Sequence, residues 1–422
     1  MDSSKRGFAG KIGLLLAMVG PGLFMIGYNI GTGSITTMAS AGSRYGLSLM
    51  WTLILSCVFT FVLLVAYGRY TLVSGETAML AYKKHLPVGK WLAIYTIFVL
   101  TIGELAALAG ITGIITELIQ EWLAIVIGVK IGMLPIAAVI IFGSFALLMI
   151  GKYSSFEKLL TTLVILMGAC FLMSVFLVVP KPAALLSGLM PKIPNAPNAF
   201  IIIASMAGTT CSAMVFVMRS IIVAEKGWNK THLRQETVDS FVSATVMFVL
   251  SAAVMACAAG TLYTMGIPVE RAVDMVKTLE PIAGSFAISI FTLGIVGAGI
   301  STLFPIALIL PWLICDYRGT ERNIQTPLFR ILGGLGLLIG FTVPVFGGRP
   351  VWIMIISTAF QATILPVVTL AIIMLVNSKK IMGEHKAGRW LNIGLWATFV
   401  FSLVTSYVSI LGFLESIQNI LG

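Results

Sequence analysis

Gly27-Tyr28-Asn29-Ile30-Gly31-Thr32-Gly33-Ser34 decides the predicted fold of this chain, together with a second stretch, Ala207-Gly208-Thr209-Thr210-Cys211-Ser212. Each stretch lies in the middle of an apolar run that is long enough to cross a membrane. Glycine costs about 1 kcal/mol in a helix interior, and hydroxyl side chains can bond the backbone in place of helix partners. Both stretches therefore predict points at which a membrane-spanning helix unwinds. The alternative is that they form two faces of small residues against which other helices pack.

The composition predicts an all-α integral membrane protein. Of the 422 residues, 58% are hydrophobic and only 10% are charged, whereas soluble domains carry about 25% charged residues. A span needs about 20 mostly apolar residues, and we expect about eleven spans. Their approximate limits are 12–41, 47–68, 91–116, 132–150, 159–179, 199–224, 239–264, 284–314, 331–346, 351–376 and 390–414. No polar stretch is long enough for a separate soluble domain, so residues 1–422 are predicted to form a single transmembrane domain.

The two predicted breaks occupy corresponding places in two halves of the chain. Spans one to five cover about 12–179, spans six to ten cover about 199–376, and an extra helix covers about 390–414. A matched pair of broken helices indicates a transporter with two inverted repeats and a binding site near the midplane of the membrane. We therefore predict a 5+5 inverted repeat, with helices 1 and 6 broken, that moves a small solute across a bilayer.

The basic residues predict how the chain is oriented. The net charge is +11, and most of the 27 lysines and arginines fall in one set of alternate loops, from Lys5 through the 226–234 loop to Lys386. Loops rich in lysine and arginine stay in the cytoplasm. The N-terminus of a multi-pass plasma-membrane protein is therefore expected inside, and the C-terminus, after an odd number of spans, outside. This asymmetry accounts for the charge without a nucleic-acid partner.

Several short motifs resemble those of the NRAMP metal-ion transporters over nearly the whole chain. The matching landmarks are Gly20-Pro21 before the first break, Arg44-Tyr45-Gly46 with Trp51, Arg69 with Ser74-Gly75, Leu365-Pro366, and the run from Ser378 to Gly383. The resemblance implies a leucine-transporter-like fold and a proton-coupled secondary transporter of divalent cations, with no resident cofactor. Members of the family hold their metal with an Asp and an Asn at the first break and a Met at the sixth-span break.

This chain departs from the family at those metal-binding positions. The aspartate position is Gly31, the asparagine position is Ser34, and the family's Met-Pro-His reads Ser212-Ala213-Met214. A further family histidine is Arg219, and the acidic residue after the first break is Met38. Transition metals prefer carboxylate, imidazole or soft sulfur ligands. The sequence therefore predicts no tight transition-metal site here, although Met214 can still turn inward.

Two hypotheses about the cargo remain. The run Gly31-Thr32-Gly33-Ser34 exposes backbone N–H groups at the start of a half-helix, and these suit a carboxylate or an amino-acid-like solute. Thr209, Thr210 and Ser212 would add hydroxyl contacts, and we prefer this organic solute on the sequence alone. The alternative is a divalent cation, Mn²⁺, Fe²⁺ or Mg²⁺. Magnesium keeps several waters and needs few protein ligands, but it still needs a carboxylate.

Five polar residues within the spans are candidates for coupling, gating or binding. Glu104 and Arg219 are charged, and charges inside a membrane are expensive and often functional. Glu104 occupies a position near the family's proton pathway, and its alternative role is an ion pair with Arg219. Ser301 and Thr302 match hydroxyls that bind Na⁺ in sodium-coupled relatives of the fold, so the coupling ion is H⁺ or Na⁺. Gln361 lines or gates the pathway, or it bonds a neighbouring backbone group.

The remaining polar residues do not indicate an enzyme. No nucleophile arrangement or metal-type cluster falls within the predicted spans, and no nucleotide-binding motif occurs. The five cysteines lie in or at the edge of apolar runs and are expected to be small packing residues. We expect Glu76, Arg234, Glu236 and Asp239 to form surface or inter-helix ion pairs without a direct role in transport.

Overall fold

The computed structural model describes residues 31–150, 154–178 and 188–421, and these contain helices and turns but no strand. The longer helices are α3 (Thr32–Tyr45), α4 (Met50–Ser74), α6 (Gly89–Trp122), α7 (Met133–Ile150), α8 (Ser154–Leu177), α10 (Ala199–Thr210), α11 (Ala213–Glu225), α12 (Leu233–Gly260), α15 (Ala287–Ala307), α16 (Ile309–Arg318), α17 (Pro327–Leu338), α19 (Pro350–Ala362), α20 (Leu365–Asn377) and α22 (Arg389–Leu421). The short helices are α5 (Ala78–His85), α13 (Leu262–Met265), α14 (Glu280–Ala283), α18 (Thr342–Phe346) and α21 (Lys379–Met382).

The predicted spans agree with the helices of the described residues. Nine helical stretches in this part of the chain are long and apolar enough to cross a membrane, and α8 contains a shorter apolar helix over Ile165–Leu177. The first predicted span is described only from Gly31 onward, so its residues 12–30 lie outside the described part of the chain. Each of the ten later spans corresponds to described helices, but several limits differ by six residues or more: the third span was predicted to end at 116 and α6 ends at Trp122, and the last was predicted to end at 414 and α22 ends at Leu421.

The predicted break in the sixth span is confirmed. Helix α10 ends at Thr210, α11 begins at Ala213, and Cys211 and Ser212 have non-helical backbones between them. In the first span, Gly31 is extended and α3 begins at Thr32, where the outer half-helix was expected.

Two further breaks were not predicted. Helix α15 gives way to α16 at Leu308, and α19 gives way to α20 at Thr363 and Ile364. Pro366 lies in the first turn of α20, where its missing N–H group costs nothing.

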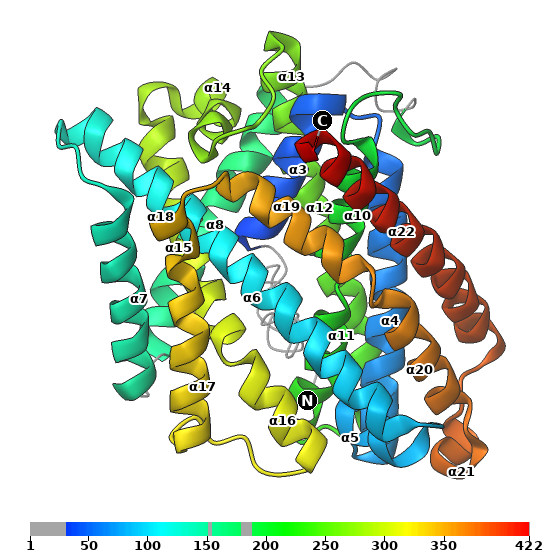
Figure 1. Ribbon diagram of the computed structural model, residues 1–422. Helices are drawn as coiled ribbons and strands as arrows, with labels where there is room; N and C mark the ends of the chain where they lie inside the picture. The colour runs from blue at the N-terminus through cyan, green and yellow to red at the C-terminus, as the bar shows by residue number, and fades with distance from the viewer. Residues whose placement is uncertain (1–30, 151–153, 179–187, 422) are drawn as a thin grey trace, which may run out of the picture.

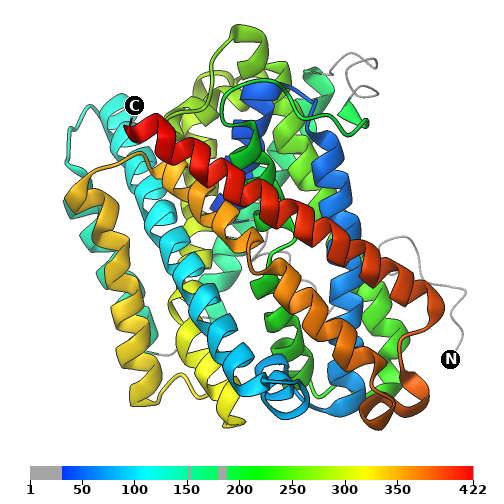
Figure 2. The same ribbon diagram turned by 45° about the vertical axis from the view of Figure 1, so that its right-hand side comes forward.

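Helices that are distant in sequence surround the centre of the molecule. In Figures 1 and 2, α6 runs diagonally across the bundle, and α3, α10 and α19 lie together in its upper half. Helix α22 crosses the outside of α10 and α20. Helices α10 and α19 approach closely because Gly208 has no side chain: a Cβ atom there would overlap the carbonyl oxygen of Thr358.

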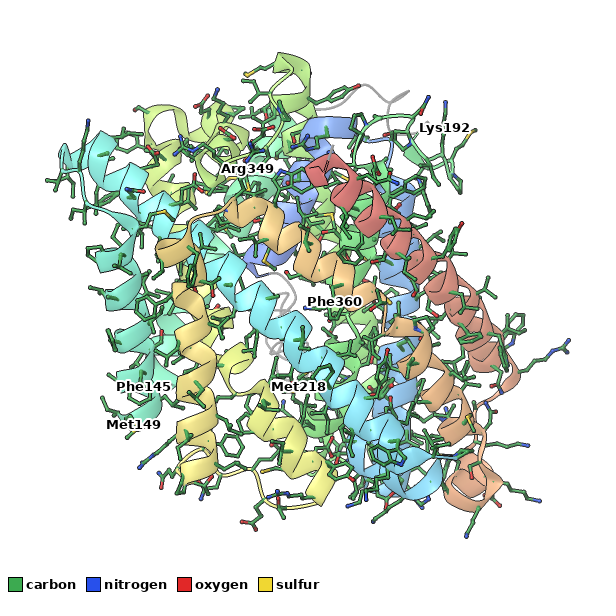
Figure 3. The ribbon with its side chains drawn as sticks, viewed as in Figure 1. Phe145, Met149, Lys192, Met218, Arg349 and Phe360 are labelled. Atoms are coloured by element: carbon green, nitrogen blue, oxygen red, sulfur yellow. The ribbon has the colours of Figure 1, made fainter. Side chains whose placement is uncertain are left out.

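The outside of the bundle is suited to lipid. Phe145 and Met149 project from α7 at the side of the molecule in Figure 3, whereas Lys192 and Arg349 lie toward one end. Helix α22 also exposes large apolar side chains, among them Trp390 and Tyr407. Apolar surface on this scale is rare in soluble monomers. The basic helices α5 and α21 both lie at the end opposite α13 and α14 (Figure 1).

Candidate substrate site

A small cavity lies where the broken helices meet. Its volume is about 40 Å³, and helices α3, α6, α15 and α19 and the break between α10 and α11 supply its wall. The lining residues are Gly31, Gly33, Ser34, Glu104, Ala107, Ile111, Thr209, Ser212, Thr302, Ile306, Met354, Thr358 and Gln361. The two stretches that predicted the breaks therefore lie on one cavity, as expected for the binding site of such a fold.

The start of α3 presents bare backbone to this cavity. Gly31 is the residue before the helix, and the N–H groups of the first helical turn have no partner within their own helix. A Cβ atom at Gly33 would overlap Cε of Met354 and would lie 3.8 Å from Oγ1 of Thr209. The hydroxyl of Ser34 is 3.3 Å from that of Ser251 on α12. Any ligand here would thus meet glycine backbone and one hydroxyl.

The opposite wall is built by the sixth-span break and α19. Ser212 donates a hydrogen bond from its hydroxyl to Oε1 of Gln361 at 3.0 Å. The hydroxyl of Thr358 lies 2.6 Å from that of Ser205. Thr209 lies in the last turn of α10, where the helix leaves carbonyl groups without intrahelical partners and carries partial negative charge. This wall therefore offers oxygen atoms to a positively charged ligand.

Glu104 gives the cavity its charged group. Its side chain lies on α6 and is only 3% exposed, and it is among the lining residues. Among the described residues that line the cavity there is no lysine, arginine or histidine. Gly103 precedes Glu104 in α6. A Cβ atom at Gly103 would be 2.9 Å from Cγ of Gln361, so the glycine lets α19 approach α6. The chemistry of the wall favours a cation over an anion.

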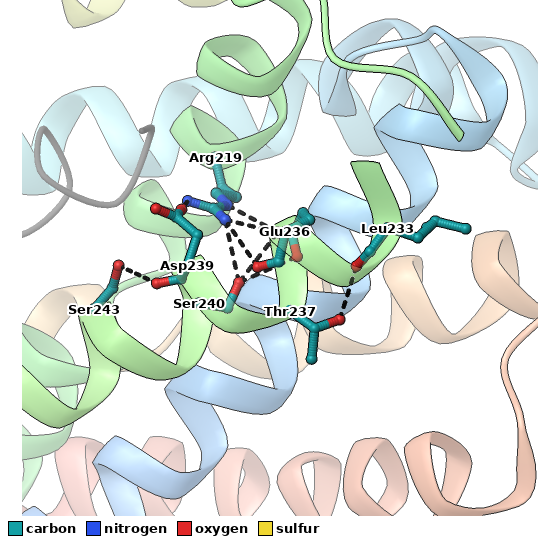
Figure 4. A network of polar contacts seen from close by, with 7 residues as sticks. All are labelled: Arg219, Leu233, Glu236, Thr237, Asp239, Ser240 and Ser243. Carbon is teal, nitrogen blue, oxygen red and sulfur yellow. Dashed lines mark hydrogen bonds and ion pairs between the residues drawn. The ribbon is translucent and has the colours of Figure 1, made fainter. Parts of the chain in front are cut away.

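Arg219 does not pair with Glu104. The expected alternative role of Glu104, an ion pair with Arg219, is therefore wrong. The guanidinium of Arg219 on α11 contacts Glu236 at 2.8 Å and Asp239 at 2.5 Å, both on α12 (Figure 4). Ser240 accepts a further hydrogen bond from Arg219 Nη2 at 3.2 Å. Glu236 and Asp239 form inter-helix ion pairs as expected, but these are fully buried rather than on the surface.

Four other candidates lie outside the cavity wall. Thr32 and Thr210 are buried, and their hydroxyls have no hydrogen-bond partner among the described residues. Met214 is completely buried on α11 and does not reach the lining. Ser301 donates a hydrogen bond to the carbonyl of Ala298 and is not part of the wall, unlike its neighbour Thr302.

Sequence reasoning missed two residues that α19 contributes to the wall, Met354 and Thr358. Together with Gln361 they recur at intervals of four and three residues, which places them on one face of α19. This spacing was visible in the sequence. A methionine in an apolar span does not stand out, however, and nothing local shows that this face points at a cavity.

The described residues contain no group of three or more His, Cys, Asp or Glu side chains that could hold a metal ion. A bound cation would therefore rest on one carboxylate, an amide oxygen, hydroxyls and the thioether of Met354. Oxygen donors of this kind suit hard ions such as Mg²⁺, Ca²⁺ and Mn²⁺.

A family model and several relatives of known name match nearly the whole chain. The model of the natural resistance-associated macrophage protein-like family (Nramp) matches residues 22–412. The divalent metal cation transporter MntH of Bacillus subtilis (strain 168) is 21% identical over 408 residues, with 94% of this chain and 91% of the relative covered. Its namesake in Xylella fastidiosa (strain 9a5c) is 25% identical over 412 residues, with 93% and 84% covered.

Two solved structures share the fold. The manganese transporter of Eremococcus coleocola, solved with an aromatic bis-isothiourea compound, matches with a TM-score of 0.73 and 17% identity and covers 99% of this chain and 90% of its own. A nucleobase-cation-symport-1 family transporter with bromovinylhydantoin bound matches with a TM-score of 0.56 and 12% identity, over 94% and 91% of the two chains.

Proposed function

This chain belongs to the natural resistance-associated macrophage protein-like family of membrane transporters, and we propose that it is a secondary transporter that carries a divalent cation. The observation that carries this proposal is the place of Glu104 in the wall of the cavity, among neutral oxygen donors. On the sequence alone we preferred an organic solute over a divalent cation, and we now reverse that preference. The relatives named above as divalent metal cation transporters support the same conclusion.

The size of the cavity supports an ion as cargo. A water molecule needs about 10–15 Å³ of such space, so 40 Å³ accommodates a cation with a few waters. Pockets for organic ligands of drug size are about 300–1,000 Å³. One carboxylate compensates only part of a double charge in a low-dielectric site. We therefore expect weak binding of a partly hydrated ion, Mg²⁺ or Mn²⁺, rather than a tight transition-metal site.

Protons are the proposed coupling ion. Among the described residues of the cavity wall Glu104 is the titratable group, so it is the group that would take up and release the coupling proton. Sodium is less well supported, because the hydroxyls of Ser301 and Thr302 both donate hydrogen bonds to the carbonyl of Ala298, at 2.8 and 2.7 Å. The proposed orientation remains the one expected from the basic loops, with the N-terminus in the cytoplasm and the C-terminus outside.

A small organic solute remains the second candidate, for one specific reason. The glycine backbone at Gly31 and Gly33 lies on the cavity and offers N–H groups to a carboxylate or amide. The nucleobase-cation-symport-1 transporter, which has a related fold, is described with an organic hydantoin bound. An opening of the cavity during transport would be needed to admit such a ligand.

Uptake into proteoliposomes tests the proposal. The purified chain should take up Mg²⁺ or Mn²⁺, and an inward pH gradient should increase accumulation. Glu104→Gln keeps the shape of the side chain and removes its charge, so it should abolish gradient-driven accumulation. Glu384→Gln alters an exposed acid on the basic end of the protein and should behave like the parent. Uptake of amino acids or nucleobases without any divalent-cation uptake would reject this proposal in favour of the second candidate.

A further inference from the structure

We infer that the connection between helices α20 and α22 is a docking surface for the headgroups of anionic phospholipids. This connection, the basic turn, comprises residues 378–389. It carries the cations Lys379, Lys380, Lys386 and Arg389 and the single acid Glu384, all with exposed side chains. Clusters of lysine and arginine directly beside a membrane span are typical of surfaces that bind anionic lipids. The inference goes beyond the proposed function and holds for either cargo.

The cations of the basic turn are available to an external anion. None of their side chains forms an ion pair, a hydrogen bond or a cation–π contact with another residue that the structure describes. Other cations at the same end do have such partners: Lys84 pairs with Glu76 at 2.8 Å, and Lys83 lies over the ring of Tyr317. Because like charges repel one another, a bound anion would relieve the repulsion within the turn.

Hydrogen bonds hold the basic turn against the bundle. Asn377 Nδ2 donates to Oδ1 of Asn392 at 2.7 Å, which joins the end of α20 to the start of α22. From α4, Arg69 Nε donates to the carbonyl of His385 at 2.9 Å. These bonds fix the turn without using any of its four cations. The charges are therefore presented on an ordered scaffold.

The adjoining face of α22 places the basic turn at the level of lipid headgroups. Large apolar side chains recur along this helix at intervals of three and four residues and are more than half exposed, beginning with Trp390, Ile393, Trp396 and Val400. Residues at this spacing share one face of a helix, and such a face is suited to acyl chains. Tryptophan is enriched where acyl chains meet headgroups. Since the turn directly precedes Trp390, which is 84% exposed, it lies where lipid phosphate groups are expected.

The competing explanation is that these charges only fix the orientation of the chain and are covered by water. Loops rich in lysine and arginine stay in the cytoplasm without any bound lipid. In that case the lipids around the turn would have the composition of the whole membrane. A docking surface instead concentrates anionic lipid, by about fivefold for each lysine or arginine near it, which corresponds to about 1 kcal/mol.

Quenching of Trp390 by brominated lipids measures this local composition. The full chain is placed in phosphatidylcholine vesicles with a minor share of phosphatidylglycerol, and either one lipid or the other carries bromine on its acyl chains. Trp390 is one of eight tryptophans, and subtraction of a Trp390→Phe sample isolates its signal. Phosphatidylglycerol should account for about fivefold more quenching than its share of the vesicle, and high salt should reduce the excess. Both leaflets contain both lipids, so the result does not depend on the orientation of the chain.

Three variants test whether the charges of the turn cause the enrichment. Lys386→Gln combined with Arg389→Gln should remove most of it. Lys130→Gln combined with Lys192→Gln is the matched control, because it removes the same charge from exposed positions in loops that are expected on the other side of the membrane. This control should keep the enrichment of the parent. Glu384→Gln removes the acid of the turn and should increase the enrichment.

Quenching of Trp390 in proportion to the composition of the vesicle, measured in the parent chain, overturns the inference without any variant. Full enrichment in the Lys386 and Arg389 double variant, or an equal loss in the matched control, overturns it as well. If the double variant does not fold, the parent measurement and Glu384→Gln decide, and a fall in enrichment in Glu384→Gln contradicts the inference. If inorganic phosphate abolishes the enrichment and sodium chloride of the same ionic strength does not, the turn binds a soluble anion and the inference is wrong.

Discussion

Replacement of Arg219 by methionine is expected to destabilise the protein severely. Arg219 Nε and Nη2 both donate to Oε1 of Glu236, at 3.0 and 2.8 Å, and Nη1 donates to Oδ2 of Asp239 at 2.5 Å. All three side chains are between 0% and 1% exposed. Methionine fills much of the same volume but leaves two neighbouring carboxylates buried without the guanidinium.

The magnitude follows from this geometry. Removal of one partner of a buried ion pair costs about 3–5 kcal/mol, because the remaining charge loses its compensation in a low-dielectric site. Two carboxylates lose their partner here, so we expect a value toward the upper end of that range for Arg219→Met. Arg219→Lys keeps the charge but cannot reproduce the forked contacts to both acids, so its cost should be intermediate.

Equilibrium unfolding in mixed micelles, followed by tryptophan fluorescence, measures these differences. The control is a triple variant that combines Arg219→Met with Glu236→Gln and Asp239→Asn. It removes every charge of the cluster and should recover most of the lost free energy of unfolding. A cost below about 1 kcal/mol for Arg219→Met, or a triple variant as unstable as the single one, would refute the reasoning. The predicted gating role of Arg219 stays a prediction, and a stable triple variant that still transports would leave Arg219 a structural role.

Three further predictions concern the site, the topology and the response to pH. Gly33→Val places a branched side chain against the thioether and into the cavity, so uptake should be lost although the protein still elutes as a folded species; full uptake would remove this backbone from the site. The cysteine introduced by Lys230→Cys should not react with an impermeant maleimide added outside intact cells. Background labelling should be low because all five native cysteines are buried. Labelling of this cysteine from outside would reverse the proposed orientation. Burial raises the pKa of Glu76, but hydrogen bonds from Lys84 and His85 outweigh it and leave the pKa below its usual 4.5. Those contacts should therefore stabilise the protein fully above about pH 4.5 and lose their effect as the pH falls through the lowered pKa, and Glu76→Gln should flatten this part of a stability–pH profile.

Much of the candidate site was predictable because its key residues interrupt regular structure. Gly31, Gly33, Thr209 and Ser212 were singled out from glycine and hydroxyl residues in apolar runs, and all of them line the cavity. Their roles in binding stay predictions. The polar face of α19 was only partly recognised, because Gln361 is conspicuous in an apolar span whereas a methionine is not.

The sequence by itself determined the class of protein, the approximate limits of its spans and the break in the sixth span. These properties are local: the length of an apolar run sets a span, and a cluster of glycine and hydroxyl residues weakens a helix where it stands. The division into two inverted halves also came from the sequence. The boundaries of the two halves stay a prediction.

Only the tertiary structure decided which side chains share an environment. It placed Glu104 and Met354 on one cavity, and it gave Arg219 its partners Glu236 and Asp239 on the next helix. The physical reason is that a helical residue faces a direction set by the rotation and crossing of its helix. Those depend on how helices far apart in sequence pack together, as α10 does on α19 at Gly208, and not on the residues beside it in the chain.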